Sequence, residues 1–119
     1  MNHPRLTVEH GGDGTVCIAP HGELDLGTVY GFDAEVRRLE EDTRPAAMVV
    51  DLRDVTFVDS AGLARLIAVA ERARRRGQRA RFVRGPRAVT RLFALTGLSA
   101  AIEWVSAPDE LPTGAPPAA

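Results

Sequence analysis

Residues 57–63, Phe57–Leu63 (FVDSAGL), join the end of an apolar run to the start of a helical apolar pattern. A short polar side chain is favoured at such a junction, because the first N–H groups of a helix lack partners within the helix and Asp or Ser can accept from them. Ser60 is therefore either an ordinary helix cap or a hydroxyl placed for modification. A phosphate there would lie against the positive end of the helix and add about −1.5 to −2 charge to the surface.

The segments on either side of this junction have opposite periodicities. Before it, Ala46–Leu52 is a short continuous apolar run, which is typical of a central strand covered on both faces. After it, apolar residues recur at helical spacing until three arginines, residues 74–76, and Gly77 end the pattern. The apolar positions of this predicted helix are Leu63, Leu66, Ile67, Ala70 and Ala73.

The first part of the chain predicts a hairpin followed by a helix. Residues 5–10 and 15–20 alternate polar and apolar side chains around the turn sequence Gly-Gly-Asp-Gly. Residues 22–25 then form an expected exit loop. From about Thr28 the period becomes helical, and residues 43–45 end the helix. Its apolar face consists of Val29, Phe32, Val36 and Leu39.

The last part of the chain predicts a strand over 79–83, a helix from Pro86 to Gly97 and a strand over 102–105. The apolar positions of that helix are Val89, Leu92, Phe93 and Leu95. The resulting β-β-α-β-α-β-α-β order predicts an α/β fold, with helices packed on a mixed sheet of about five strands. We expect one domain over residues 1–111 and a disordered Pro- and Ala-rich tail over 112–119, with function on loops at strand ends.

Composition limits the possible functions. The 119 residues, 45% hydrophobic and 26% charged, indicate one soluble domain, and no apolar run approaches the roughly 18 residues that span a membrane. Cys17 is the only cysteine, so it has no disulfide partner within the chain, which fits a cytoplasmic location. The three histidines, His3, His10 and His21, lack metal-ligand spacing, so no metal site is expected.

Arginines gather in the second half of the chain, which raises the question of nucleic-acid binding. They spread over two predicted helices and a strand without interleaved aromatic residues, and the chain contains no lysine. A solvated basic face is therefore favoured over direct contact with nucleic acid. The arginines concerned are Arg65, Arg72, Arg74, Arg75, Arg76, Arg79, Arg81, Arg84, Arg87 and Arg91.

Three motifs in order resemble the STAS family, and within it the bacterial anti-sigma factor antagonists. They are Gly22–Asp25 (GELD), Asp59–Leu63 (DSAGL) and Val89–Leu98 (VTRLFALTGL). The resemblance covers about residues 5–106. Each motif alone is weakly specific, whereas the ordered set is strongly so.

The resemblance implies a noncatalytic binding module with no cofactor, which regulates transcription by partner switching. Its implied partner is an anti-sigma factor that doubles as a serine/threonine kinase, with a serine phosphatase as a further candidate. Ser60 would be the phosphoacceptor: the unphosphorylated form binds the anti-sigma factor and frees a sigma factor, and phosphorylation ends the binding. Asp25, Asp59, Ser60, Ala61 and Gly62 would form the partner surface. A phosphate in this acidic neighbourhood would repel a partner fitted to the neutral hydroxyl.

Each of these positions also has a purely structural interpretation. Asp25 could cap the first helix, Asp59 could be the true cap of the second, and Gly62 could serve close packing of helix on sheet. The fold also allows a second function, a STAS interaction module without a kinase cycle, such as that of a membrane transport system.

Two other functions, a serine hydrolase and a phosphorelay receiver domain, fit the residues poorly. A hydrolase elbow needs Gly two residues before the serine, where this chain has Val58, and no histidine follows Ser60. A receiver domain would use Asp51, but the first strand offers only Glu9 as a second carboxylate for magnesium.

Overall fold

The computed structural model describes residues 5–78, 80–97 and 102–108. In chain order its elements are β1 (Arg5–His10), β2 (Thr15–Leu24), α1 (Val29–Thr43), β3 (Ala47–Asp51), β4 (Val55–Val58), α2 (Ser60–Arg75), β5 (Ala80–Val83), α3 (Arg87–Thr96) and β6 (Glu103–Val105). The expected tail over 112–119 and the ends of the expected domain lie outside the described residues. No helix in the described ranges is long and apolar enough to cross a membrane.

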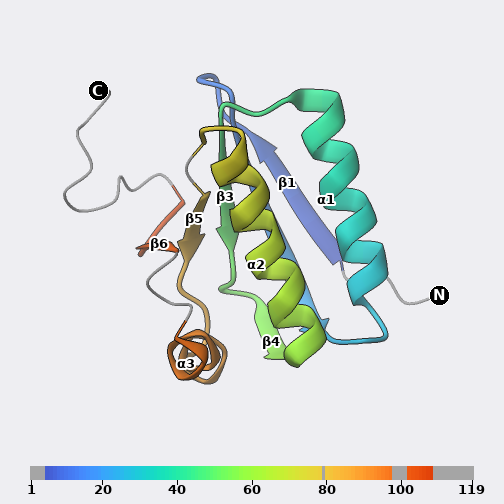
Figure 1. Cartoon of the computed structure of the whole chain (residues 1–119), viewed down its shortest axis with the longest axis vertical. Helices are drawn as coiled ribbons and strands as arrows, with labels where there is room; N and C mark the ends of the chain where they lie inside the picture. The colour runs from blue at the N-terminus through green and yellow to red at the C-terminus, as the bar shows by residue number, and fades with distance from the viewer. Residues whose placement is uncertain (1–4, 79, 98–101, 109–119) are drawn as a thin grey trace.

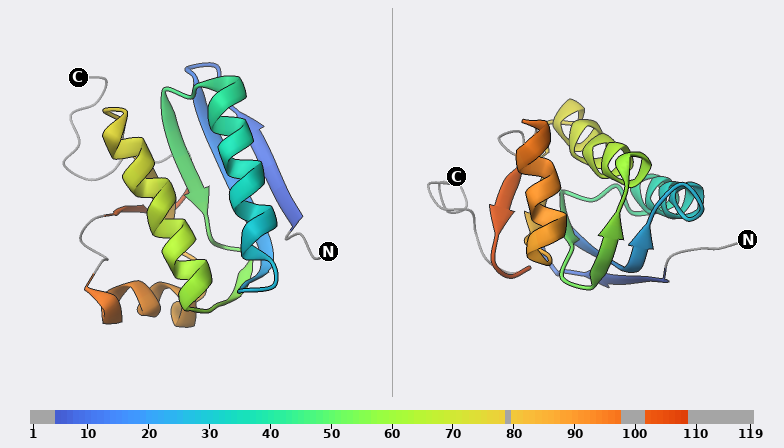
Figure 2. Two further views of the ribbon diagram at one scale, coloured as in Figure 1. Left: turned by 45° about the vertical axis from the view of Figure 1, so that its right-hand side comes forward. Right: turned by 90° about the horizontal axis from the view of Figure 1, so that it is seen from below.

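The described strands form one six-stranded mixed sheet, which confirms the predicted α/β class. Its order is β1-β2-β3-β5-β6, and β4 pairs with the far end of β2. β1 is antiparallel to β2, and the other pairs are parallel. Helices α1 and α2 cover one face of the sheet side by side, whereas α3 lies at one end, against β4 (Figures 1 and 2). Both covering helices begin at that same end of the molecule.

The end of β2 differs from the sequence prediction. We expected an exit loop over residues 22–25, but the strand continues to Leu24 and pairs there with β4, a strand that the sequence analysis missed. Gly22 has a positive φ of 87° and coincides with a shift of register. In β4 only Val55 and Val58 are buried, so the segment lacks the alternation that marks a strand in sequence.

The core lies between the helices and the sheet. On α2 the predicted face is buried at Leu63, Leu66, Ala70 and Ala73, and Ile67 is partly buried against it. On α3 the prediction fails for Leu95, which is 71% exposed. The buried residues of this helix are Val89 and Phe93. Leu95 comes two residues after Phe93, so its side chain is rotated by about 200° around the helix axis and points away from the core.

Edge-to-face aromatic contacts hold α3 against the sheet. The ring centroids of Phe93 and Trp104 lie 5.2 Å apart, and each ring also meets Phe82 on β5. Such pairs are worth about 0.5–1.5 kcal/mol beyond the area that they bury. This cluster therefore fixes the position of α3 beside the end of the sheet at which α2 begins.

A candidate partner-binding site at the start of helix α2

Asp59, not Ser60, caps helix α2. The Asp59 backbone is extended, and its Oδ1 accepts a hydrogen bond of 2.9 Å from the Gly62 N–H. Ser60 is the first helical residue. Its side chain is exposed, and its hydroxyl makes no hydrogen bond with any residue of the described ranges. The interpretation of Ser60 as an ordinary helix cap is therefore wrong, and the hydroxyl is left available at the surface.

The same carboxylate joins the start of α2 to the loop between β2 and α1. The Asp59 Oδ2 accepts a hydrogen bond of 3.0 Å from the Leu26 N–H, and the Asp59 N–H donates to the Leu24 carbonyl. Hydrogen bonds from the Gly62 N–H, then from the Leu26 and Ala61 N–H groups, hold the pKa of Asp59 below its ordinary value. Asp59 is thus an ionised anchor beside Ser60.

Asp25 shapes the neighbouring loop. Its Oδ1 accepts from the Gly27 N–H at 2.9 Å and from the Thr28 N–H at 3.1 Å, and its carbonyl accepts from the Val29 N–H at 2.8 Å. Thr28, the N-terminal flanking residue of α1, makes no cap with its own side chain. The interpretation of Asp25 as a cap of the first helix is therefore wrong: its carboxylate folds the loop in front of α1 and bonds no N–H group of the helix itself. Asp25 also lies next to Leu26, which Asp59 holds.

Gly62 allows α2 to begin directly against the end of β2. A Cβ atom at this position would lie 2.1 Å from the Leu24 carbonyl oxygen, far inside contact distance. Gly62 is buried, whereas Ala61 is half-buried at the rim of the site. The absence of a side chain at Gly62 thus has a packing cause, which was one of the two interpretations of the sequence.

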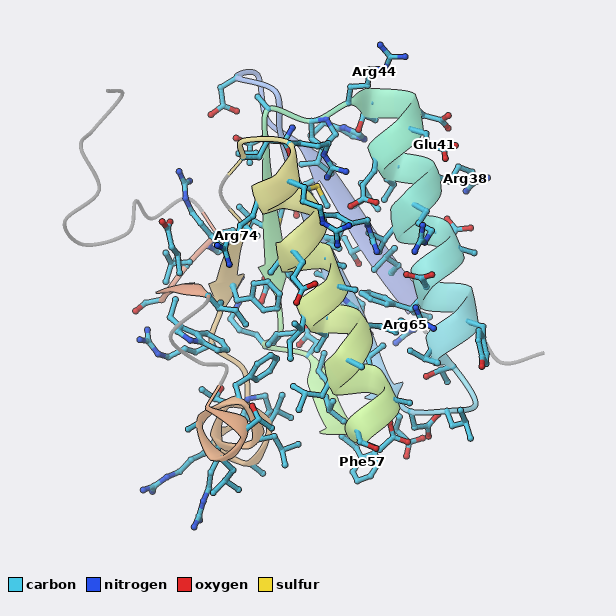
Figure 3. All side chains as sticks on the ribbon, in the orientation of Figure 1. Arg38, Glu41, Arg44, Phe57, Arg65 and Arg74 are labelled. Atoms are coloured by element: carbon cyan, nitrogen blue, oxygen red, sulfur yellow. The ribbon has the colours of Figure 1, made fainter. Side chains whose placement is uncertain are left out.

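Exposed apolar side chains surround this end of the molecule. Leu26 in the loop is 63% exposed, Tyr30 in the first turn of α1 is 67% exposed and Phe57 on β4 is 50% exposed. Figure 3 shows Phe57 projecting outward next to the start of α2. None of these three side chains is among the site residues predicted from sequence, although Phe57 lies in the 57–63 stretch that contains Ser60. The buried residues of β4 are Val55 and Val58, and the two residues between them are exposed.

The described residues give Ser60 no general base. Both carboxylate oxygens of Asp59 accept backbone hydrogen bonds. His21 lies on β2 and has other partners: its Nε2 is 2.8 Å from the Thr7 hydroxyl oxygen, and its Nδ1 is 3.5 Å from the Asp54 Oδ2. Within the described part of the chain, no group of three or more His, Cys, Asp or Glu side chains could hold a metal ion.

Two further groups named by the sequence analysis have structural roles. Asp51 accepts a bidentate ion pair from Arg53, with Nη2 to Oδ2 at 2.8 Å. Burial opposes its ionisation, but the side-chain and backbone hydrogen bonds from Arg53 outweigh burial and lower the pKa of Asp51. Cys17 is half-buried, and burial followed by the nearby Asp51 raises the pKa of its thiol to about 11. Neither group is poised for chemistry.

The family model of the STAS domain matches residues 7–110, and the chain belongs to this family. It is 33% identical over 97 residues to the anti-sigma-F factor antagonist RsfA of Mycobacterium tuberculosis, an alignment that covers 81% of this chain and 75% of RsfA. The resemblance drawn from the three sequence motifs is thus confirmed for the family, and this relative carries the name of an anti-sigma factor antagonist.

Solved structures agree with this assignment. An anti-sigma factor antagonist from Mycobacterium paratuberculosis superposes with a TM-score of 0.73 at 28% identity, covering 88% of this chain and 87% of that chain. The Bacillus cell fate determinant SpoIIAA in its phosphorylated form superposes with a TM-score of 0.67 at 18% identity, covering 85% of this chain and 91% of that chain. The second likeness is one of fold.

Proposed function

We propose that this protein is an anti-sigma factor antagonist that binds an anti-sigma factor while the Ser60 hydroxyl is free, and so releases a sigma factor. The observation that carries the proposal is the exposed Ser60 hydroxyl at the first position of α2, which Asp59 leaves unused by capping the helix itself. The names of the relatives in the same family support the class of partner.

The anti-sigma factor also acts as a kinase: it phosphorylates Ser60 of the protein that binds it, and this phosphorylation ends the binding. It transfers the terminal phosphoryl group of ATP to the Ser60 Oγ: the O–P bond to Ser60 forms, the bond to ADP breaks, and the hydroxyl proton passes to a base of the kinase. Ser60 suits this role because its backbone is fixed by Asp59 while its side chain remains exposed. ATP and sigma factors are cytoplasmic, and so is the proposed reaction. A serine phosphatase would restore the hydroxyl.

Charge and desolvation explain how one phosphate ends the binding. The phosphate would carry about −1.5 to −2 charge beside the ionised Asp59, although the positive end of α2 favours it within the fold. A partner packed against a neutral hydroxyl would face two adjacent anions. A hundredfold loss of affinity needs only about 2.7 kcal/mol, which is within the effect of one charged group at an interface. The fold need not change.

The residues of the proposed surface divide into two roles. Ser60 and Ala61 lie at the surface itself, together with the exposed side chains of Leu26 and Phe57. Asp25, Asp59 and Gly62 shape that surface, because Asp25 folds the loop, Asp59 ties the loop to α2 and Gly62 lets the helix start against β2. We assign all of them to partner binding, the second group mainly by positioning.

Phosphorylation by native candidate kinases tests this proposal. The purified protein is incubated with ATP and each candidate anti-sigma factor, and the phosphate is mapped by mass spectrometry. We expect it on Ser60, with no modification of Ser60→Ala and full modification of Thr56→Ala, which removes another exposed hydroxyl close by on β4. A phosphate on a different residue, or none with the complete set of partners, would contradict the kinase cycle and favour a STAS interaction module without one.

A further inference from the structure

Strand β1 forms an open edge of the sheet. Among the described strands it pairs only with β2, and the right-hand view of Figure 2 shows it at the margin of the molecule. The strand at the other edge, β6, has three residues, whereas β1 has six and contains neither a proline nor a bulge. Open edges of this length tend to pair with another strand, and proteins usually guard them. The edge of β1 therefore calls for an occupant.

The side chains of β1 alternate between the two faces of the sheet. Leu6 and Val8 are half-buried and pack against the core between the sheet and the helices. The alternate positions, Arg5, Thr7 and Glu9, point to the opposite face and are exposed. Neither Arg5 nor Glu9 makes an ion pair with a described residue. The exposed side of the strand thus presents one positive and one negative side chain.

The backbone groups of β1 divide between β2 and the open edge. The Gly11 N–H donates to the Thr15 carbonyl at 2.8 Å, and these two residues continue the register of the β1–β2 ladder. Hydrogen-bonded pairs alternate with non-hydrogen-bonded pairs in an antiparallel ladder, so every second residue before Gly11 bonds to β2. Leu6 and Val8 belong to the other set, and their N–H and C=O groups therefore face the open edge.

We propose that β1 pairs antiparallel with β1 of a second copy of this chain, with Thr7 on the two-fold axis. In this register Leu6 lies opposite Val8 of the second copy, and each such pair exchanges both of its N–H···O bonds. Arg5 lies opposite Glu9 of the second copy in a non-hydrogen-bonded pair, where side chains approach most closely. Opposite charges at such positions stabilise the pairing of strands. The two sheets then continue through the interface.

Charge selects this register over its neighbours. A shift of the pairing by two residues places Thr7 opposite either Arg5 or Glu9, and both charge pairs are lost. A shift by one residue would set the apolar face of one strand beside the polar face of the other. Charged side chains commonly guard an edge, but here those of two copies are complementary. None of these residues belongs to the partner surface proposed around Ser60, so the inference goes beyond that function.

Analytical ultracentrifugation of the purified protein between about 1 µM and 1 mM tests the proposal. One strand pair is a small interface, so we expect a weak dimer whose population rises with protein concentration. A protein that stayed monomeric over this whole range would overturn it.

Reversal of single charges tests the interface itself. Arg5→Glu and Glu9→Arg should each weaken self-association at least tenfold, because like charges then lie opposite each other at both ends of the interface. An equimolar mixture of the two variants should associate again, since the acidic strand of one faces the basic strand of the other, and this result also shows that both variants fold. Glu41→Arg on α1 is the matched control and should weaken self-association less than twofold. A mixture that stayed monomeric, or equal weakening by Glu41→Arg, would contradict the pairing.

A disulfide at the symmetry axis tests the register. Opposed residues of a non-hydrogen-bonded pair have Cα atoms about 4.5 Å apart, which a disulfide can span. In a Cys17→Ala background, Thr7→Cys should therefore give a covalent dimer under mild oxidation, whereas Val8→Cys should not, because Val8 lies opposite Leu6. A covalent dimer through Val8→Cys alone would overturn the register. Protection of the Leu6 N–H from hydrogen exchange only after addition of the anti-sigma factor would assign the edge to that partner instead.

Discussion

The carboxylate of Asp59 accepts a hydrogen bond from the Leu26 N–H at 3.0 Å, although 33 residues separate the two positions in the chain. With its other oxygen the same carboxylate caps α2 through the Gly62 N–H. One side chain thus fixes both the helix that carries Ser60 and the loop beside it. The hydroxyl of Ser60 takes no part in this fixation and remains at the surface.

Replacement of Asp59 by Asn should change how stability depends on pH. The pKa of Asp59 is lowered in the folded protein, so its ionised form stabilises the fold above the unfolded pKa of about 3.9, and this contribution is lost as the pH falls through the folded pKa. In urea unfolding, the wild-type protein should exceed Asp59→Asn in stability near pH 7, and the gap should close as the pH falls through the lowered pKa of Asp59.

The control for this experiment is Asp42→Asn. Asp42 is exposed on α1 and has no hydrogen bond or ion pair with a described residue, so this variant removes one negative charge without removing a cap. A gap between wild type and Asp59→Asn that stayed constant down to about pH 2 would show that the Asp59 carboxylate does not carry the stabilisation.

Gly62→Ala should destabilise the protein even though alanine is the better helix former. Helix propensity favours alanine by up to about 1 kcal/mol, but the new Cβ would lie 2.1 Å from the Leu24 carbonyl oxygen, and forced repacking typically costs about 1–3 kcal/mol. Chemical denaturation measures the sum. Gly12→Ala, where nothing lies within 4 Å of the new Cβ, should change stability by less than about 0.5 kcal/mol. A neutral or stabilising Gly62→Ala would show that the contact is relieved by movement of the helix.

The sequence predicted the helices well because their signals are local. The apolar spacing of α2, the Pro86 start of α3 and the Gly97 end of α3 all appear within one helix, and the structure places these helices within a residue or two of expectation. The ends of β2 and β4 depend instead on a contact between distant segments. Gly22 donates to the Asp54 carbonyl and the two strands then pair, which no pattern within either segment reveals.

The candidate site was also only partly predictable. The sequence identified Ser60 and Asp59 as neighbours but left open which of them caps the helix. Only the geometry decides this, because either side chain can accept from the first turn. The contact of Asp59 with Leu26 joins two segments that are far apart in the chain, so no pattern within either segment predicts it. The phosphoacceptor role of Ser60 stays a prediction, and so do the partner contacts of all five residues, Asp25, Asp59, Ser60, Ala61 and Gly62.

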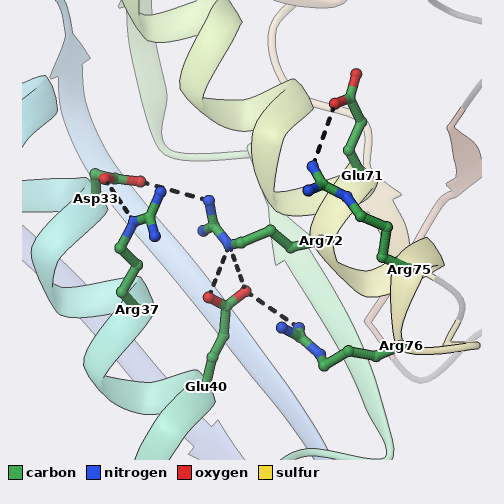
Figure 4. Close-up of polar contacts among 7 residues, drawn as sticks. All are labelled: Asp33, Arg37, Glu40, Glu71, Arg72, Arg75 and Arg76. Atoms are coloured by element: carbon green, nitrogen blue, oxygen red, sulfur yellow. Dashed lines mark hydrogen bonds and ion pairs between the residues drawn. The ribbon is translucent and has the colours of Figure 1, made fainter.

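Glu40→Gln should be far more damaging than Glu71→Gln. Both glutamates face arginines of α2, but Glu40 is buried between Arg72 and Arg76, whereas the Glu71–Arg75 pair is exposed and 3.7 Å apart (Figure 4). Removing one partner of a buried pair leaves an uncompensated charge, so we expect a loss of about 3 kcal/mol for Glu40→Gln. For Glu71→Gln we expect about 0.5 kcal/mol or less. Similar urea midpoints for the two variants would show that the buried network adds nothing.

Phe57→Ala should weaken partner binding more than it weakens the fold. Phe57 is half exposed beside the start of α2, and apolar anchors of this kind contribute strongly at interfaces. We expect about a tenfold loss of affinity for the anti-sigma factor, which corresponds to about 1.4 kcal/mol. Leu95→Ala, which removes another exposed apolar side chain from α3, is the matched control and should bind normally. If the Phe57 variant bound as tightly as wild type, the partner surface would have to lie elsewhere.

The affinity of the anti-sigma factor for the protein before and after phosphorylation tests the Ser60 switch most directly. Both forms are purified, the phosphate is verified on Ser60 by mass spectrometry, and the dissociation constants are measured by calorimetry at one salt concentration. We expect the phosphorylated form to bind at least about 100-fold more weakly, with an unchanged circular dichroism spectrum. Equal affinity of the two forms would contradict a switch at Ser60.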